Sequence, residues 1–154
     1  MIKINVISNN IIWKRYIKNP RAFIDKQIKL INKKKGIYKK NIFICTLLLS
    51  GTKEIRQLNK KFRKKNKSTD VLSFPFYEKR HLKKIISEEK EIYLGDIIIN
   101  LNKINNKKND KKFKNQLNKL WIHGFLHLLG HNHKLDKEYC KMQKLENKFL
   151  NFVK

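Results

Sequence analysis

Three histidines near the C-terminus have the spacing of a metal site. His123 and His127 are four residues apart, so on a helix their imidazoles lie on one face, about one turn from each other. Gly130 can adopt the left-handed conformation that ends a helix, and the returning chain would bring His133 towards the same point. Three protein ligands and an open fourth position are typical of a catalytic zinc, whereas structural zinc sites are normally closed by four ligands. The pattern predicts one Zn2+ ion on His123, His127 and His133, and it disfavours the alternatives of chance clustering or helix packing.

The residue after the first histidine bears on the type of reaction. The spacing His-x3-His-x2-Gly-x2-His is that of the metzincin proteases, in which a glutamate follows the first histidine and serves as general base. Here that position is Gly124, which argues against peptide hydrolysis. Asp70 and Asp96 are candidates for another base or for a hydrogen-bond partner of a histidine. Such residues more often cap a turn or bond to the backbone.

The charge of the chain favours a phosphate-rich partner. The 154 residues include 38 Lys and Arg and only 12 Asp and Glu, which gives a formal net charge of +26. Such an excess attracts polyanions and makes nucleic acid the best partner class. A drift towards AT-rich codons would also enrich lysine, so the charge alone does not establish the partner.

The cysteines and the apolar segments indicate the compartment. Cys45 and Cys140 lie far apart in apolar surroundings, which predicts buried thiols in a reducing cytoplasm rather than a disulfide. Residues 1–18 lack the apolar segment and cleavage site of a signal peptide, and the apolar run 42–49 is too short to span a bilayer. We expect a cytoplasmic protein with no membrane association and no disulfide-linked partner.

The segments rich in β-branched and apolar residues predict strands at 2–6, 41–49, 68–76 and 93–100. Pro75 cannot donate a ladder hydrogen bond, so it predicts an edge strand or a strand end. Gly95 allows a bulge or a close backbone approach. The charged segment 77–91, which contains His81, shows no clear periodicity and is expected to be an exposed, mobile loop.

Apolar residues at helical spacing predict four or so helices. These begin at Pro20 (ending near Gly36), at a cap on Thr52, near residue 112 and at a cap on Asp136. The residues expected to face inward are Phe23, Ile24, Ile28, Ile31, Ile55, Leu58, Phe62, Phe113, Leu117, Leu120, Trp121, Gly124, Tyr139, Met142, Leu145 and Phe149. The elements predict a single α+β domain over residues 1–154, with a mixed sheet of about four strands packed against helices.

Three stretches in series resemble the YbeY family of bacterial rRNA maturation factors. His123 to His133 resembles the family's box His-Gly-x-Leu-His-Leu-x-Gly-Tyr-Asp-His. Asn59 to Phe76 is similar to an Asn-x-x-Phe-Arg stretch that runs into Thr-Asp-Val-Leu-Ser-Phe-Pro. Leu94 to Ile97 matches Leu-Gly-Asp-Ile, and the order and spacing agree over most of the chain.

The resemblance implies a metal-dependent, single-strand-specific endoribonuclease. Its zinc would be held by His123, His127 and His133, on a helix under a cleft that also contains Arg63. The implied roles are 16S rRNA 3′-end maturation and ribosome quality control, with single-stranded rRNA and the small ribosomal subunit as partners. Arg63 would clamp a phosphate through its planar guanidinium. The candidate substrate-binding residues in the basic run, which could also be plain solvated charges, are Lys60, Lys61, Lys64 and Lys65.

Two residues depart from the family's box. His131 and Asn132 stand where the family usually has Tyr-Asp. Asn132 lacks a carboxylate that could orient a metal-bound imidazole, although its amide oxygen can still accept a hydrogen bond. His131 is either a spare ligand or a loop residue. A non-catalytic ribosome-assembly factor with a structural zinc therefore remains an alternative, and a zinc peptidase is a weaker one.

Overall fold

The chain folds around a mixed sheet of four strands in the order β1-β2-β4-β3. This computed structural model describes residues 1–8, 10–34, 40–133 and 135–153. Strands β1 (Ile2–Ser8), β2 (Ile42–Ser50) and β4 (Glu91–Asn100) run parallel to one another, and β3 (Val71–Pro75) pairs antiparallel with β4 at one edge. The α+β class with a mixed four-stranded sheet is confirmed.

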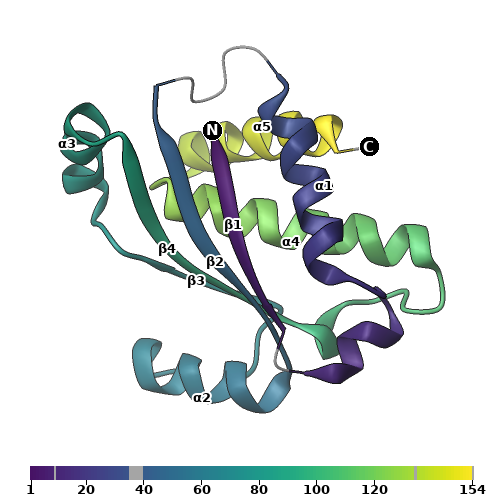
Figure 1. The fold of residues 1–154 in the computed structure, drawn as a ribbon. Helices are drawn as coiled ribbons and strands as arrows, with labels where there is room; N and C mark the ends of the chain where they lie inside the picture. Colours follow the sequence, from purple (N-terminus) through teal and green to yellow (C-terminus); the bar gives the residue numbers. More distant parts are fainter. Residues whose placement is uncertain (9, 35–39, 134, 154) are drawn as a thin grey trace.

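Helices cover the two faces of the sheet unequally (Figure 1). Helices α1 (Pro20–Asn32), α4 (Asp110–Leu128) and α5 (Asp136–Phe152) lie on one face, which we call the inner face. Helix α2 (Thr52–Arg63) covers only the lower part of the other, outer face, and α3 (Lys79–Glu88) connects β3 to β4. Two short 3-10 helices, η1 (Ile11–Arg15) and η2 (Leu101–Lys103), follow β1 and β4.

The core lies between the inner face and its three helices. It includes Phe43, Leu47, Ile97 and Trp121, which are all at most 1% exposed. A second, smaller cluster under α2 contains the buried residues Ile55, Leu72 and Ile98. No helix covers the upper part of the outer face in this way (Figure 1).

The edge strand has the features expected from its sequence. Pro75 is the last residue of β3, and β3 is an edge strand. Gly95 has a φ of +127°, and a Cβ there would collide with the carbonyl oxygen of Phe74 on the neighbouring strand. The β2–β4 register shifts at this point, so the predicted bulge is confirmed.

The segment 77–91 is not a loop, because residues 79–88 form α3. Leu82, Ile85 and Ile86 are three and four residues apart and pack against the main core, with Leu82 3% exposed. This apolar stripe is narrow and lies among charged residues, which hides the helical period. His81 is exposed on the same helix.

Several smaller predictions are wrong at the helix ends and on the surface. Thr52 and Asp136 are the first residues of α2 and α5 rather than their caps, and neither helix has a side-chain cap bond. Tyr139 is 51% exposed and Cys140 is exposed too, because both lie on the solvent side of α5. Helix α1 ends at Asn32, and the end expected near residue 36 lies outside the described residues.

Phe62 does not face inward either, because it is 57% exposed. Cys45 is buried, as expected, and both cysteines are free thiols. None of the described helices has the length and apolarity needed to cross a bilayer.

Candidate metal centre

The turn after α4 brings the third histidine back to the helix. Gly130 has a φ of +80°. Its N–H donates to the carbonyl of His127 at 2.9 Å, and the N–H of His131 donates to the carbonyl of Leu126 at 3.0 Å. This pair of bonds is a Schellman motif, which satisfies the last carbonyls of the helix and reverses the chain. The predicted glycine stop is confirmed, and it places His133 beside the helix.

The three histidines converge as their spacing predicts. His123, His127 and His133 each offer a ring nitrogen, and these nitrogens all lie within 4.8 Å of one another. The Nε2 atoms of His123 and His127 are 3.1 Å apart. Such close approach of donor nitrogens suits a cation between them, because neutral imidazole nitrogens are metal ligands. The three side chains could therefore hold one metal ion.

His127 is held in the protonation state that a ligand needs. Its Nδ1 lies 3.0 Å from the carbonyl oxygen of His131, so Nδ1–H donates and Nε2 keeps its lone pair. Burial lowers the pKa of His127 to about 4, and the neighbouring charge of His123 adds to this effect. His127 is therefore neutral at pH 7. His131 contributes this carbonyl and lies outside the convergent group, so its side chain is not a spare ligand there.

A carboxylate that the sequence patterns do not single out lies beside His123. Oε2 of Glu146, on α5, is 3.5 Å from Nδ1 of His123. Glu146 is only 9% exposed, and its Oε1 is buried with no hydrogen-bond partner among the described residues. A carboxylate on the second nitrogen of a metal-binding imidazole orients the ring and raises its basicity. One feature of the sequence could have indicated Glu146. It lies four residues after Met142 and three before Phe149, so it is an acidic residue on the apolar face of a helix.

Asp70 and Asp96 have other partners. Oδ1 of Asp70 accepts hydrogen bonds from the Val71 backbone N–H at 2.8 Å and from the Thr69 hydroxyl at 2.9 Å. Oδ1 of Asp96 accepts from the Tyr93 hydroxyl at 2.6 Å on the outer face of the sheet. Both aspartates therefore make local hydrogen bonds, which agrees with a structural role and not with that of a base or a histidine partner.

We expect the variant Glu146→Gln to bind zinc about 10- to 100-fold more weakly, which is the usual cost of losing such an outer partner. The amide keeps the size of the side chain but removes its charge. The measurement is a competition titration against a zinc chelator. The matched control is Glu138→Gln, because Glu138 lies on the same helix and pairs with Lys79 instead of a histidine. Equal zinc affinity in both variants would show that Glu146 does not support His123.

Arg63 ends α2 and reaches the edge strand. Its Nη2 donates to the carbonyl oxygen of Ser73 at 3.1 Å, and its charge is one of those that lower the pKa of His127. Lys64 follows in the left-handed conformation, with a φ of 59°, and terminates the helix. Arg63 therefore links the outer helix to the edge strand.

The candidate lysines are on the surface next to Arg63. Within the described part of the chain, none of their ammonium groups pairs with a carboxylate. The four exposed residues are Lys60, Lys61, Lys64 and Lys65. Their number and closeness make this end of α2 strongly cationic.

Gly124 is required by the packing of α4 on the sheet. A Cβ at this position would lie 2.7 Å from Cγ2 of Ile97 and 3.1 Å from Oγ of Ser73. A glutamate like that of the metzincins would therefore have to displace Ile97 and Ser73. The same close contact holds the histidine helix against β3 and β4.

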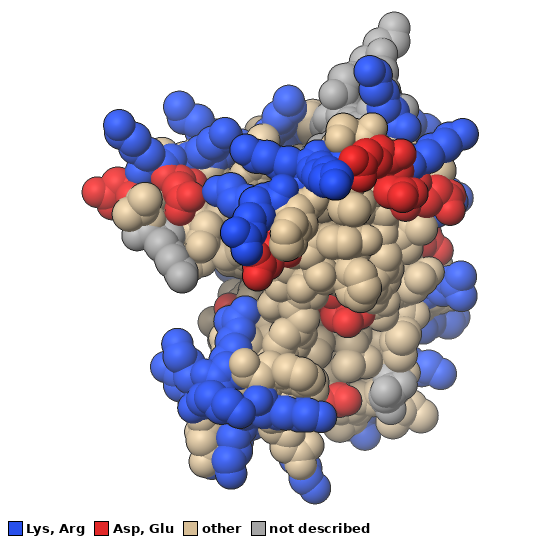
Figure 2. Space-filling model, turned by 90° about the vertical axis from the view of Figure 1, so that its left-hand side faces the viewer, with Lys and Arg blue, Asp and Glu red and all other residues tan. Residues whose placement is uncertain are grey.

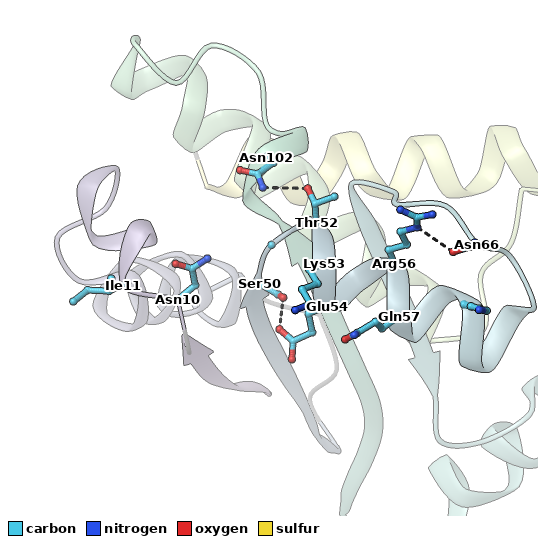
Figure 3. A pocket seen from close by; sticks show the side chains of 12 residues that line it. Asn10, Ile11, Ser50, Thr52, Lys53, Glu54, Arg56, Gln57, Asn66 and Asn102 are labelled. Carbon is cyan, nitrogen blue, oxygen red and sulfur yellow. Dashed lines mark hydrogen bonds between the residues drawn. The ribbon is translucent and has the colours of Figure 1, made fainter.

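The cavities differ in their relation to the histidines. A cavity of about 230 Å³ adjoins them and is lined by His123, His133, Tyr139 and Glu146, among others. A larger cavity, of about 1020 Å³, lies elsewhere, between η1 and α2 (Figure 3). It is polar, with Thr52 bonded to Asn102 and Arg56 bonded to Asn66, and it contains none of the three histidines.

A mixed sheet packed against a helix with three convergent histidines at its end is the arrangement of a protein that could bind a metal ion. A sequence model of the family described as Endoribonuclease YbeY matches residues 7–154. Endoribonuclease YbeY of Pelagibacter ubique (strain HTCC1062) is 44% identical over 156 residues, which cover 100% of this chain and 97% of that protein. Endoribonuclease YbeY of Thermodesulfovibrio yellowstonii is 35% identical over 159 residues, which cover 99% and 92%. The chain belongs to the YbeY family.

The fold has a counterpart among solved structures. The solution structure of TM1509 from Thermotoga maritima superimposes with a TM-score of 0.59 at 24% sequence identity. The match covers 98% of this chain and 89% of that one. At this identity the likeness concerns the fold alone.

Proposed function

We propose that this protein is a zinc-dependent endoribonuclease that cleaves single-stranded RNA during rRNA processing, with residues 1–154 as one catalytic domain. The observation that carries the proposal is the convergence of His123, His127 and His133 next to Arg63 and an unpaired lysine cluster. Membership of a family described as endoribonucleases supports the reaction class.

Zinc is the metal that suits this donor set. Three neutral imidazoles with one position left open are a common catalytic zinc site, and the buried carboxylate of Glu146 supplies the usual outer partner. When bound, Zn2+ provides a Lewis acid for a phosphoryl oxygen and lowers the pKa of a coordinated water towards about 7. The role of His127 Nδ1–H is to keep the ring fixed on the carbonyl of His131.

Arg63 is the residue that we assign to the phosphate. A guanidinium presents several N–H donors in one plane, so one can remain on the carbonyl of Ser73 while others bind phosphate oxygens. Held in this way, Arg63 would stabilise the charge that develops on the phosphate as the bond breaks. Lys60, Lys61, Lys64 and Lys65 would hold the flanking phosphates by charge alone.

The cellular role proposed is 16S rRNA 3′-end maturation and ribosome quality control on the small ribosomal subunit, in the cytoplasm. The name shared by the relatives supports an activity on RNA, and the free thiols Cys45 and Cys140 suit a reducing compartment. The second candidate is a non-catalytic assembly factor that binds RNA through its lysines and keeps the zinc for structure. The unpaired lysine cluster would serve that factor equally well, so cleavage has to be measured directly.

The variant Arg63→Ala is expected to retain zinc and to cleave RNA about 100- to 1,000-fold more slowly, the usual cost of losing one donor that acts on developing charge. The assay uses zinc-loaded protein and a single-stranded RNA with an rRNA 3′ end, and metal content is measured on each sample. Arg56→Ala is the matched control, because Arg56 lies on the same helix but bonds to Asn66.

The same assay separates the candidate functions. A chelator should abolish cleavage by the unaltered protein, and added zinc should restore it. If the zinc-loaded protein binds the RNA without ever cutting it, the assembly factor is the correct description. If it cuts casein and spares RNA, the protein is a peptidase despite Gly124.

A further inference from the structure

Aromatic side chains gather on the outer face of the sheet next to the edge strand. The ring of Phe62, in the last turn of α2, lies 5.2 Å from that of Phe74 on β3. The ring of Phe76, just after β3, lies 5.0 Å from Tyr77 and 5.9 Å from Tyr93 on β4. Phe74 and Phe76 are two residues apart, so they extend from the same face of the chain. Tyr77 packs back against the main core. The two pairs Phe62–Phe74 and Phe76–Tyr93 form what we call the aromatic platform.

The platform is open to solvent at both ends. Phe62 is 57% exposed and Phe76 is 66% exposed, whereas the buried residues under α2 stop at Ile55, Leu72 and Ile98. Isolated exposed apolar residues need no explanation, but several large rings in contact with one another form a patch that is costly in water. Such a patch points to a ligand with an apolar, flat surface.

Unpaired cations border the platform. The Nζ atom of Lys61 lies 5.3 Å from the centre of the Phe62 ring. Figure 2 faces this side of the molecule and shows Lys and Arg gathered at the height of α2 and again higher up, with a mostly uncharged region that contains a few acidic side chains between them. The cations of α3 differ from those of α2, because Arg80 and Lys84 pair with Glu78 and Glu88 on the same segment. The free positive charge is therefore concentrated at the α2 end of the platform.

The platform also adjoins Arg63, the residue that we assign to the phosphate. Phe62 and Arg63 are neighbours in the chain, and so are Phe74 and Ser73. The rings of Phe62 and Phe74 meet on the outer face. The next residue after Phe62, Arg63, donates to the carbonyl of the residue before Phe74, Ser73. A strand whose phosphate is held by Arg63 would have its next nucleotides over the outer face of β3.

We propose that the aromatic platform, through the exposed rings of Phe62 and Phe76, stacks the unpaired bases of a single RNA strand whose phosphates contact the α2 lysines. This inference rests on the proposed function and adds to it a physical basis for selecting single strands. Bases in a duplex have their faces covered by neighbouring pairs, whereas unpaired bases can stack on aromatic rings without regard to sequence. The combination of a cationic track with exposed rings is the general design for such binding.

The test compares two ligands that have the same phosphates and differ in their bases. One is a fluorescently labelled 2′-O-methyl oligoadenylate, and the other is an abasic strand of equal length. Phe62→Ala and Phe76→Ala should each weaken oligoadenylate binding about 5- to 100-fold, the range for losing one base–aromatic stack. Neither should change binding of the abasic strand. Lys64→Ala should weaken binding of both strands by similar factors, and Ile11→Ala, which removes another exposed apolar side chain, should change neither.

Aromatic replacements separate stacking from packing. Phe62→Trp should keep the affinity for oligoadenylate, and its fluorescence should be quenched by that strand but not by the abasic one, since Trp13 and Trp121 are buried. Phe62→Leu should behave like Phe62→Ala. If the phenylalanine variants bind oligoadenylate normally while the unaltered protein still cleaves RNA, the stacking proposal is overturned and the nuclease assignment stands. If the unaltered protein neither binds nor cleaves RNA, both fail, and the platform is better explained as a surface for a protein partner.

Discussion

Replacing His127 with alanine is expected to remove zinc binding and RNA cleavage together. His127 lies between the other two ligands in the chain, is neutral at pH 7 and has its ring fixed by the His131 carbonyl. A structural zinc site in a small protein is worth about 10 kcal/mol or more, so the loss of one of three ligands should weaken affinity about 100- to 1,000-fold. Cleavage should fall to the level of the chelated, unaltered protein.

The measurement for His127→Ala is zinc content together with the thermal shift on adding zinc. Zinc at 100 times its dissociation constant stabilises the unaltered protein by about 2.7 kcal/mol, and the same zinc concentration should stabilise the variant by about 0.4 kcal/mol or less. His81→Ala is the control, because His81 is exposed on α3 and lies outside the convergent group. A variant that kept the zinc-dependent shift and lost only cleavage would show that His127 acts on the substrate and is not a ligand.

Gly124→Ala should lower the free energy of unfolding by about 1–3 kcal/mol. An alanine in a helix normally gains up to about 1 kcal/mol over glycine, so the sign depends on whether the neighbouring atoms can move. The new methyl group would lie 2.7 Å from Cγ2 of Ile97, a fully buried residue whose branched side chain has few alternative rotamers. Overpacking at such a site costs about 1–3 kcal/mol, and we expect it to exceed the gain in helix propensity.

Urea unfolding of the metal-free proteins measures this change. Gly51→Ala is the comparison, because a Cβ there would meet only Asn10 and Asn102, at 3.6 and 4.0 Å, and should cost less than about 1 kcal/mol. A Gly124→Ala protein as stable as the unaltered one would mean that Ile97 and Ser73 yield easily. In that case packing would not explain why glycine, and not glutamate, follows the first histidine.

Most of the sheet could be predicted because its signals are local. The alternating pattern of β1, the apolar run of β2, Pro75 at a strand end and Gly95 at a bulge each depend on a few adjacent residues. Helix α3 could not be recognised in the same way, because only Leu82, Ile85 and Ile86 mark its buried side. The exposure of Phe62 likewise depends on how little of the outer face α2 covers, which no local pattern specifies.

In the candidate site, too, the residues set by local sequence could be predicted and the residue set by tertiary packing could not. The convergence of the histidines follows from their spacing and from Gly130, since one helix and one turn contain them all. Glu146 belongs to the next helix, α5, and its position beside His123 on α4 depends on how these two helices pack. Residues that support a site from another element are found only once the tertiary structure is known.

The hydrogen bond from His127 to a main-chain carbonyl also explains how the chain can differ from its family at positions 131 and 132. The acceptor belongs to the backbone of His131, so the geometry that orients His127 is independent of which side chain stands there. At the next position, Oδ1 of Asn132 accepts from the His133 N–H at 2.9 Å, a bond that an aspartate oxygen could equally accept. We therefore expect both substitutions to be close to neutral for the candidate metal centre.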